Sequence, residues 1–147
     1  MSDVTLLTGA VWGLAGAVVM VLVMAARGGD SPPPFAVFWA RFLGDGDPGA
    51  AMPQSLLLHA VYAAVAGEVY VLVLGSVDLG LPVTTYTGGI VWGVVWAVVL
   101  LIGAMAFWGK LVLKMAPNRE QMLTIALAHL GYGLTLGLLV AAVPHLR

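Results

Sequence analysis

The chain contains no cysteine, and this absence removes several classes of site at once. Without a thiol there is no disulfide, no thiolate metal site, no iron–sulfur cluster and no covalently attached c-type haem. Charged side chains are also scarce, at 9% of the residues, whereas hydrophobic residues make up 61%. So little charge cannot surround a soluble core, and a net charge of −1 gives no hint of nucleic-acid binding. These absences predict an integral membrane protein with no nucleic-acid partner.

What the chain has instead is four long apolar stretches. The mean hydropathy is +1.03, and a helix needs roughly 20 apolar residues to cross a hydrocarbon core of about 30 Å. We place the predicted spans at about residues 6–26, 55–74, 88–107 and 122–143. Nothing basic precedes the first stretch and its apolar run is too long for a signal peptide, so we expect a retained helix. The predicted fold is all-α, with residues 1–147 as a single membrane domain.

The second half of the chain repeats the pattern of the first. The recurring pieces are residues 11–13 (VWG) at 91–93, residues 38–41 (FWAR) as 107–110 (FWGK), and His59, Tyr62 and Gly67 as His129, Tyr132 and Gly137. We therefore predict two duplicated hairpins, repeat one over about residues 6–75 and repeat two over about 86–143. In such a parallel repeat the pseudo-two-fold axis runs along the membrane normal. The duplication predicts that the two histidines lie at the same depth.

The basic residues lie almost entirely in two connections, those that join the first span to the second and the third to the fourth. They are Arg27, Arg41, Lys110, Lys114 and Arg119, while Arg147 is alone at the other side. The positive-inside rule places Lys- and Arg-rich connections in the cytoplasm. We therefore expect a multi-pass protein of the cell membrane, with the long connections cytoplasmic and both termini outside.

The first long connection contains a predicted short helix. The segment 30–34 (DSPPP) supplies a helix start, because proline is well tolerated in a first turn. Apolar residues follow it at helical spacing, namely Phe35, Phe38, Trp39, Phe42 and Leu43. One interpretation is an interfacial helix with its aromatics at headgroup level and Arg41 reaching for phosphates. The other is that the stripe packs over the cytoplasmic mouth of the bundle, and the two are compatible.

Small residues recur at four-residue spacing in the predicted spans. Lipid gives little hydrophobic drive between helices, so close contact depends on residues that let backbones approach. The expected packing glycines are Gly9, Gly13, Gly67, Gly89, Gly93, Gly133 and Gly137. These faces predict a compact bundle, with self-association or contact with other membrane subunits as its possible partners besides the lipid bilayer.

Few polar side chains lie within the predicted spans, and such groups are candidate functional residues because they are costly in a bilayer. His59 and Tyr62 share one helix face, as do His129 and Tyr132. One hypothesis is that the two imidazoles face each other and bind one b-type haem as its axial ligands. The alternative is that each is a neutral histidine bonded to a carbonyl, a tyrosine hydroxyl or a headgroup, with no cofactor. No third ligand suits zinc, so no metal site is expected.

Glu68 is the only carboxylate within a predicted span. It follows His59 by nine residues, which turns it to the opposite face and moves it about 13 Å along the helix. The second copy has Leu138 at this position, so Glu68 breaks the internal repeat. It is a candidate for contact with a partner or for a hydrated path.

The chain resembles small, uncharacterised four-span membrane proteins of halophilic archaea. The likeness lies in a histidine in the second span, in residues 40–44 (ARFLG), and in the last span at 129–133 (HLGYG) with Leu136 and Gly137 following. Ala63 departs from the pattern by standing where the last span has Gly133. The resemblance implies a membrane location and a similar helix arrangement, and it supplies no activity.

Three functional hypotheses follow from the sequence, and none requires an enzyme, because no catalytic residue combination is present. The first is a noncatalytic accessory or assembly subunit of a larger membrane complex, respiratory or energy-transducing. The second is a haem b electron carrier that uses His59 and His129. The third is a small proton-coupled transporter or channel that uses Glu68.

Overall fold

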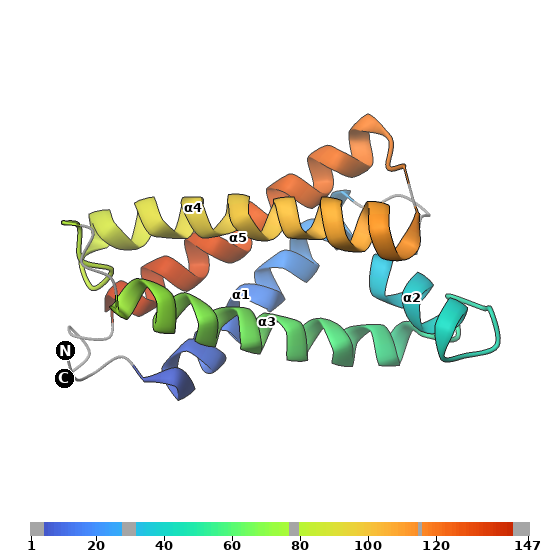
Figure 1. Cartoon of the computed structure of the whole chain (residues 1–147), viewed down its shortest axis with the longest axis horizontal. Helices are drawn as coiled ribbons and strands as arrows, with labels where there is room; N and C mark the ends of the chain where they lie inside the picture. Colours follow the sequence, from blue (N-terminus) through green and yellow to red (C-terminus); the bar gives the residue numbers. More distant parts are fainter. Residues whose placement is uncertain (1–4, 28–31, 77–79, 115, 143–147) are drawn as a thin grey trace.

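The fold is entirely helical in the part of the chain that the structure describes. The computed structural model describes residues 5–27, 32–76, 80–114 and 116–142. In chain order the helices are α1 (Leu6–Arg27), α2 (Pro34–Phe42), α3 (Met52–Ser76), α4 (Tyr86–Gly103), η1 (Ala104–Leu113) and α5 (Arg119–Ala142) (Figure 1). Four helical stretches are long and apolar enough to cross a membrane, namely α1, α3, α4 with η1, and α5. The predicted all-α membrane fold with four spans is confirmed.

Local capping sets where two of these helices begin, slightly ahead of the predicted bounds. The Thr85 side chain accepts a hydrogen bond from the Gly88 backbone nitrogen (3.1 Å), so α4 begins at Tyr86. Before α5, Asn118 and Gln121 exchange side-chain and backbone hydrogen bonds of 2.9 Å each, as in a capping box. The predicted end of the last span at residue 143 lies outside the described residues.

The third span departs most from its predicted bounds. The prediction ends it at residue 107, whereas the helical stretch continues to Leu113 because α4 passes into the π-helix η1. The backbone nitrogen of Lys114 bonds to the Gly109 carbonyl, and Lys114 takes a left-handed conformation with φ 53°. This conformation is uncommon for a residue with a side chain, and it ends the helix. Lys110 therefore belongs to the helix rather than to a connection.

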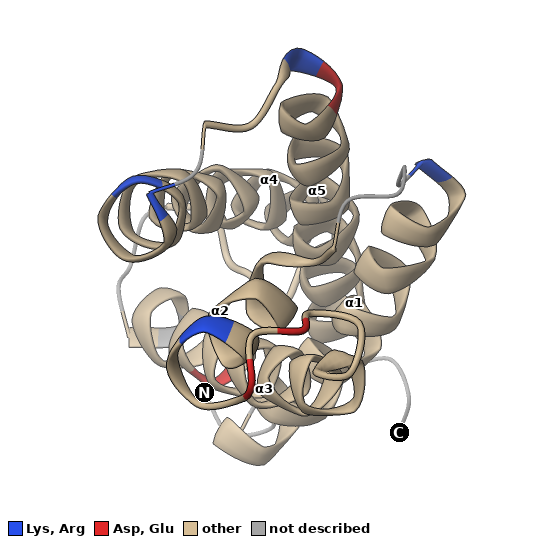
Figure 2. Cartoon of the chain, turned by 90° about the vertical axis from the view of Figure 1, so that its right-hand side faces the viewer, with Lys and Arg blue, Asp and Glu red and all other residues tan. Residues whose placement is uncertain are grey.

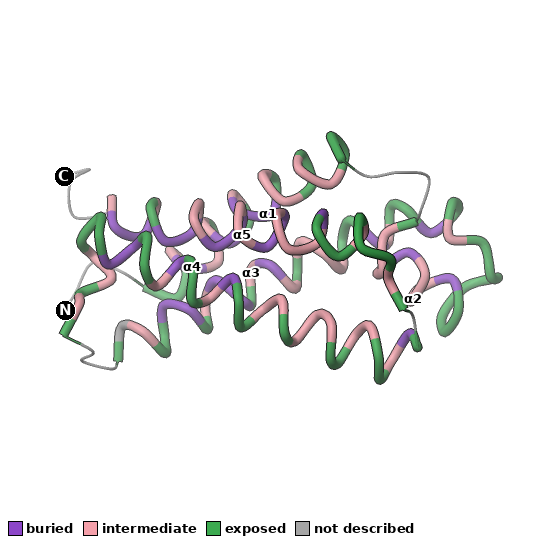
Figure 3. Tube along the Cα trace, turned by 90° about the horizontal axis from the view of Figure 1, so that it is seen from above, coloured by how far each residue is buried: buried purple, intermediate pink, exposed green. Residues whose placement is uncertain are grey.

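Three close contacts join the four spans in the order α3, α1, α5, α4. Figure 1 shows α3 and α4 nearly parallel, with α1 and α5 crossing obliquely behind them. Figure 3 shows the buried positions along the inner sides of these helices. In α1 no buried residue follows Ala17, and between Ala97 and Leu113 none is buried. The spans therefore pack tightly in one half of the bundle and more loosely toward the end that carries α2.

Glycines make the contact within each hairpin. A Cβ atom on Gly9 would lie 2.5 Å from the Gly67 carbonyl oxygen, and a Cβ on Gly13 would collide with the Ala63 carbonyl. In the other hairpin, Cβ atoms on Gly89 and Gly93 would meet the carbonyls of Gly137 and Gly133. All seven glycines that were predicted to pack helices thus lie at backbone-to-backbone contacts. These contacts occur at corresponding positions of the two hairpins. The duplication itself stays a prediction.

The short helix α2 packs over one end of the bundle. The Phe35 ring lies 5.1 Å from Trp108 and 5.8 Å from Tyr62, measured between ring centroids, and Phe38 lies 5.4 Å from Trp108. Arg41, predicted to reach for phosphates, donates from Nη1 to the Leu113 carbonyl oxygen (3.0 Å) and so holds the last turn of η1. Phe35 and Phe38 thus pack over this end of the bundle, as one interpretation of the stripe predicts, whereas Phe42 and Leu43 are exposed. Contact of α2 with headgroups stays a prediction.

A pair of Gly→Ala substitutions tests the backbone contacts. Gly137→Ala should lower the free energy of unfolding by about 1–3 kcal/mol, because the new methyl group meets the Gly89 backbone. Gly103→Ala is the control, because no atom lies within 4 Å of its Cβ position. Alanine is favoured over glycine in a helix by roughly 0.5–1 kcal/mol, so this variant should be neutral or more stable. Unfolding in mixed micelles measures both, and equal effects would contradict the packing.

Candidate functional site

The candidate residues of α5 lie inside the bundle. His129 is buried at 6% exposure, and its Nδ1 atom bonds to the Ile125 carbonyl oxygen at 2.8 Å, one turn earlier in the same helix. Tyr132 is buried at 2% exposure. His129 thus bonds within its own helix, whereas the hydrogen-bond partner of Tyr132 lies on another helix.

Tyr132 joins three helices. Its hydroxyl group donates to the Ala63 carbonyl oxygen at 2.7 Å, so α5 is bonded to α3. The ring passes α1 at Gly16, where a Cβ atom would lie 2.8 Å from the ring carbon Cδ2. Ala63 is also the residue whose carbonyl meets Gly13. Gly16 thus makes room for an interhelical hydrogen bond beside one of the close backbone contacts of the first hairpin.

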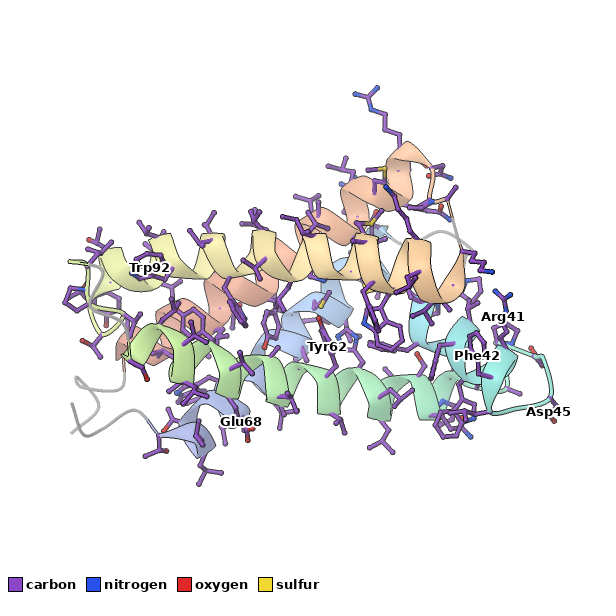
Figure 4. All side chains as sticks on the ribbon, viewed as in Figure 1. Arg41, Phe42, Asp45, Tyr62, Glu68 and Trp92 are labelled. Carbon is purple, nitrogen blue, oxygen red and sulfur yellow. The ribbon has the colours of Figure 1, made fainter. Side chains whose placement is uncertain are left out.

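The corresponding tyrosine of α3 has different surroundings. In the sequence repeat, Trp96 stands in α4 where α1 has Gly16, so no equivalent gap exists between α3 and α4. Trp96 instead packs against Tyr70, with their ring centroids 6.0 Å apart. Tyr62 lies toward Phe35 of α2 and makes no hydrogen bond within the described residues. Figure 4 shows Tyr62 in the space between α3 and η1.

His59 differs from His129 in the same way. Its Nε2 atom is buried without a hydrogen-bond partner, and neither ring nitrogen makes a hydrogen bond in the described ranges. The Phe35 ring meets the imidazole edge at a centroid distance of 5.9 Å. The two histidines are near enough to interact electrostatically. The structure therefore brings His59 and His129 into one region, but only His129 has a hydrogen-bond partner.

His59 also lines an apolar groove between α1 and α3, of about 240 Å³. The other lining residues are Leu14, Ala17, Val18, Val21, Leu22, Leu56 and Ala60. Most of them belong to the outer surface, since Val18 is 59% and Leu22 62% exposed. The groove therefore opens on a side of the bundle that would face lipid.

The arrangement of the histidines does not favour axial ligation of one haem by the pair. The groove reaches His59 and not His129, so a group bound in it would contact one of the two proposed axial ligands and not the other. Phe35 covers another edge of His59. The haem hypothesis stays a prediction that this geometry does not support. In the same described ranges no three His, Asp or Glu side chains group as metal ligands.

Glu68 lies apart from the histidines, as predicted. It is partly exposed, and its Cα atom would be 3.0 Å from a Cβ on Gly9, so it stands beside the first turns of α1. Figure 4 shows its side chain pointing to the outer side of α3, away from α4. It has no ion pair or hydrogen bond with any described residue. Nothing in this placement puts Glu68 on a path through the bundle.

The sequence reasoning missed the buried polar rings in the other half of the bundle. Trp12 Nε1, Trp96 Nε1 and the Tyr70 hydroxyl are buried without a partner among the described residues. Trp92 differs, because its Nε1 donates to the Leu81 carbonyl oxygen (2.8 Å) and ties the α3–α4 connection to α4. The sequence held one signal for this difference, because Trp96 in the second repeat stands where the first repeat has Gly16.

Tyrosine-to-phenylalanine substitutions test the bond that joins α5 to α3. Tyr132→Phe should lower the free energy of unfolding by about 0.6–1.7 kcal/mol, the range measured for hydrogen bonds between membrane helices. Tyr62→Phe is the matched control at the corresponding position, and it should leave the stability unchanged because its hydroxyl has no partner. Unfolding of both variants in mixed micelles gives the comparison. A larger loss for Tyr62→Phe would show that the bond is wrongly placed.

Known proteins offer no guide to the function of this chain, so a proposal has to start from the contacts described above. No protein-family model, no curated protein and no solved structure matches the chain. The resemblance to four-span proteins of halophilic archaea therefore stays a prediction.

Proposed function

We propose that this protein is a noncatalytic subunit of a larger membrane complex and binds a transmembrane helix of its partner along the outer face of α3. The observation that carries the proposal is Glu68, an ionisable group within a span that has no partner in the described residues. An unpaired charge in the apolar part of a bilayer costs several kcal/mol, so such groups are paired or hydrated. A neighbouring subunit supplies the missing pair.

The chain's own cations do not reach Glu68. It lies eight residues before Ser76, the last residue of α3, which is about 12 Å along the helix axis. The described Lys and Arg residues gather at the opposite end of the bundle, around the end of α1, α2, η1 and the start of α5 (Figure 2). Arg147 lies outside the described residues. A basic side chain of a partner helix is the complementary group.

The face around Glu68 has the form of a helix-packing seam. Exposed apolar residues precede and follow it on one side of α3, at the spacing of a helix face. They are Leu57 (64% exposed), Val61 (54%), Val65 (51%) and Leu72 (56%). A single polar residue in such a stripe fixes the register of two helices, which is the best-attested use of buried polar groups at helix contacts. We call this surface the α3 stripe.

The proposal also includes the orientation of the bundle in the membrane. The basic end of the bundle faces the cytoplasm by the positive-inside rule, so both termini and Glu68 lie toward the outside. The partner's basic residue would then lie in the outer half of the bilayer. Glu68 has this role without any chemistry of its own, and the histidines are not needed for it.

Site-specific crosslinking tests the proposal, because the chain has no cysteine of its own. Single cysteines are introduced by Val65→Cys and Leu72→Cys on the α3 stripe, and by Val98→Cys on the outer side of α4, which is 50% exposed. A thiol-reactive photocrosslinker is activated in native membranes, and the products are identified by mass spectrometry. We expect both stripe positions to give one and the same partner and Val98→Cys to give none.

The carboxylate is tested in the same membranes. Glu68→Leu should remove the crosslinks from Val65→Cys, whereas Glu120→Gln, a change in an exposed carboxylate at the other end, should leave them unchanged. Crosslinks that survive Glu68→Leu would contradict the role of Glu68. A product of twice the chain's mass would show self-association instead, and a monomer under all conditions would overturn the proposal.

A further inference from the structure

We infer that the groove between α1 and α3 binds the head of an isoprenoid quinone or quinol from the bilayer, with His59 as its hydrogen-bond partner. The inference does not depend on the subunit proposal, because the groove lies on a different side of α3 from the α3 stripe. It rests on the unsatisfied imidazole, on the lining of the groove and on the absence of charge in that lining.

The first step is the imidazole. His129, its counterpart in the repeat, bonds to a carbonyl of its own helix, but His59 bonds to no described residue. Leaving a polar group unpaired in an apolar medium is unfavourable. The Nε2 atom is enclosed, so a molecule in the groove reaches the imidazole through Nδ1, which also bonds to no described residue.

The second step is the depth. His59 lies seven residues after Met52, the first residue of α3, which is about 10 Å along the axis. Because α3 is long and apolar enough to cross a membrane, we expect the imidazole to lie below the headgroups. Its partner must therefore be a molecule that carries a hydrogen-bonding oxygen into the apolar layer.

The third step is the lining. Seven of the eight lining residues are aliphatic, and no Lys or Arg is among them, so the groove offers nothing to a phosphate. A phospholipid head is therefore a poor match, whereas a quinone head is neutral and carries ring oxygens that accept or donate one hydrogen bond. The exposed Val18 and Leu22 side chains suit an isoprenoid tail that runs out into the bilayer. No electron transfer is inferred, only binding.

The direct test is nitrogen NMR of the histidine side chains. The full chain, labelled with ¹⁵N-histidine, is placed in phosphatidylcholine nanodiscs and titrated with menaquinone-4 (a naphthoquinone with an isoprenoid tail). His59→Leu identifies the His59 signals by their loss. We expect a saturable shift of the His59 signals and little change at His129. A shift already present in phosphatidylcholine alone and unaltered by the quinone would make a phospholipid the occupant and overturn the inference.

Filling the groove tests the site without touching the imidazole. Ala60→Leu and Val18→Phe add side-chain volume from the two walls, and each should weaken menaquinone-4 binding by about tenfold or more, measured by calorimetry in detergent micelles. Val99→Leu is the control, because this exposed residue of α4 lines neither the groove nor the α3 stripe. Far-ultraviolet circular dichroism identifies which variants are folded. Wild-type affinity in either folded groove variant, or no saturable binding to the unaltered chain, would overturn the inference.

Discussion

The rest of this structure depends on the close approach of two pairs of helix backbones, α1 with α3 and α4 with α5. Lipid does not drive apolar helices together, so the spans are held by contacts that only glycine or alanine permits. Gly67 meets Gly9 in one hairpin and Gly137 meets Gly89 in the other. Because these contacts lie in one half of the bundle, the spans separate toward the end that carries α2. The separation leaves space for larger side chains, and the polar groups of interest border that space.

One position accounts for much of the difference between the two halves. Gly16 lets Tyr132 cross α1 and bond to Ala63, which draws α5 against α1 and α3. Trp96 occupies the corresponding position of α4 and packs on Tyr70, so rings separate α3 from α4. Phe35 and Trp108 fill the remaining space at the α2 end. One side of the bundle is thus closed by the Tyr132 contact with α1 and α3 and another by aromatic side chains, with the two histidines in unlike surroundings.

The sequence predicted the spans, the packing glycines and the short helix, because length, hydropathy and four-residue spacing are properties of one helix at a time. It did not predict that α4 continues as a π-helix to Leu113, since no proline or glycine pattern signals that winding. It placed both His–Tyr pairs inside the bundle, because each pair shares a helix face with small residues. It did not predict that the pairs have unlike surroundings, because these depend on the neighbouring helix, which carries Gly16 in one case and Trp96 in the other. A groove between two helices likewise depends on their crossing, which periodicity does not encode.

Among the described residues of α3, His59 and Glu68 both have polar side chains without a hydrogen-bond or ion-pair partner, but they differ in their surroundings. Glu68 carries a full charge when ionised and stands in an exposed apolar stripe, so a cation on a helix of similar length matches it best. The groove beside His59 has room for a small head group and not for a helix, because the backbones of α1 and α3 are already in contact nearby. The size of each site and the charge of its polar residue therefore suit different binding partners. A bundle of this size can hold a lipid-soluble molecule on one side of α3 and a protein partner on the next, since the faces are adjacent and do not overlap.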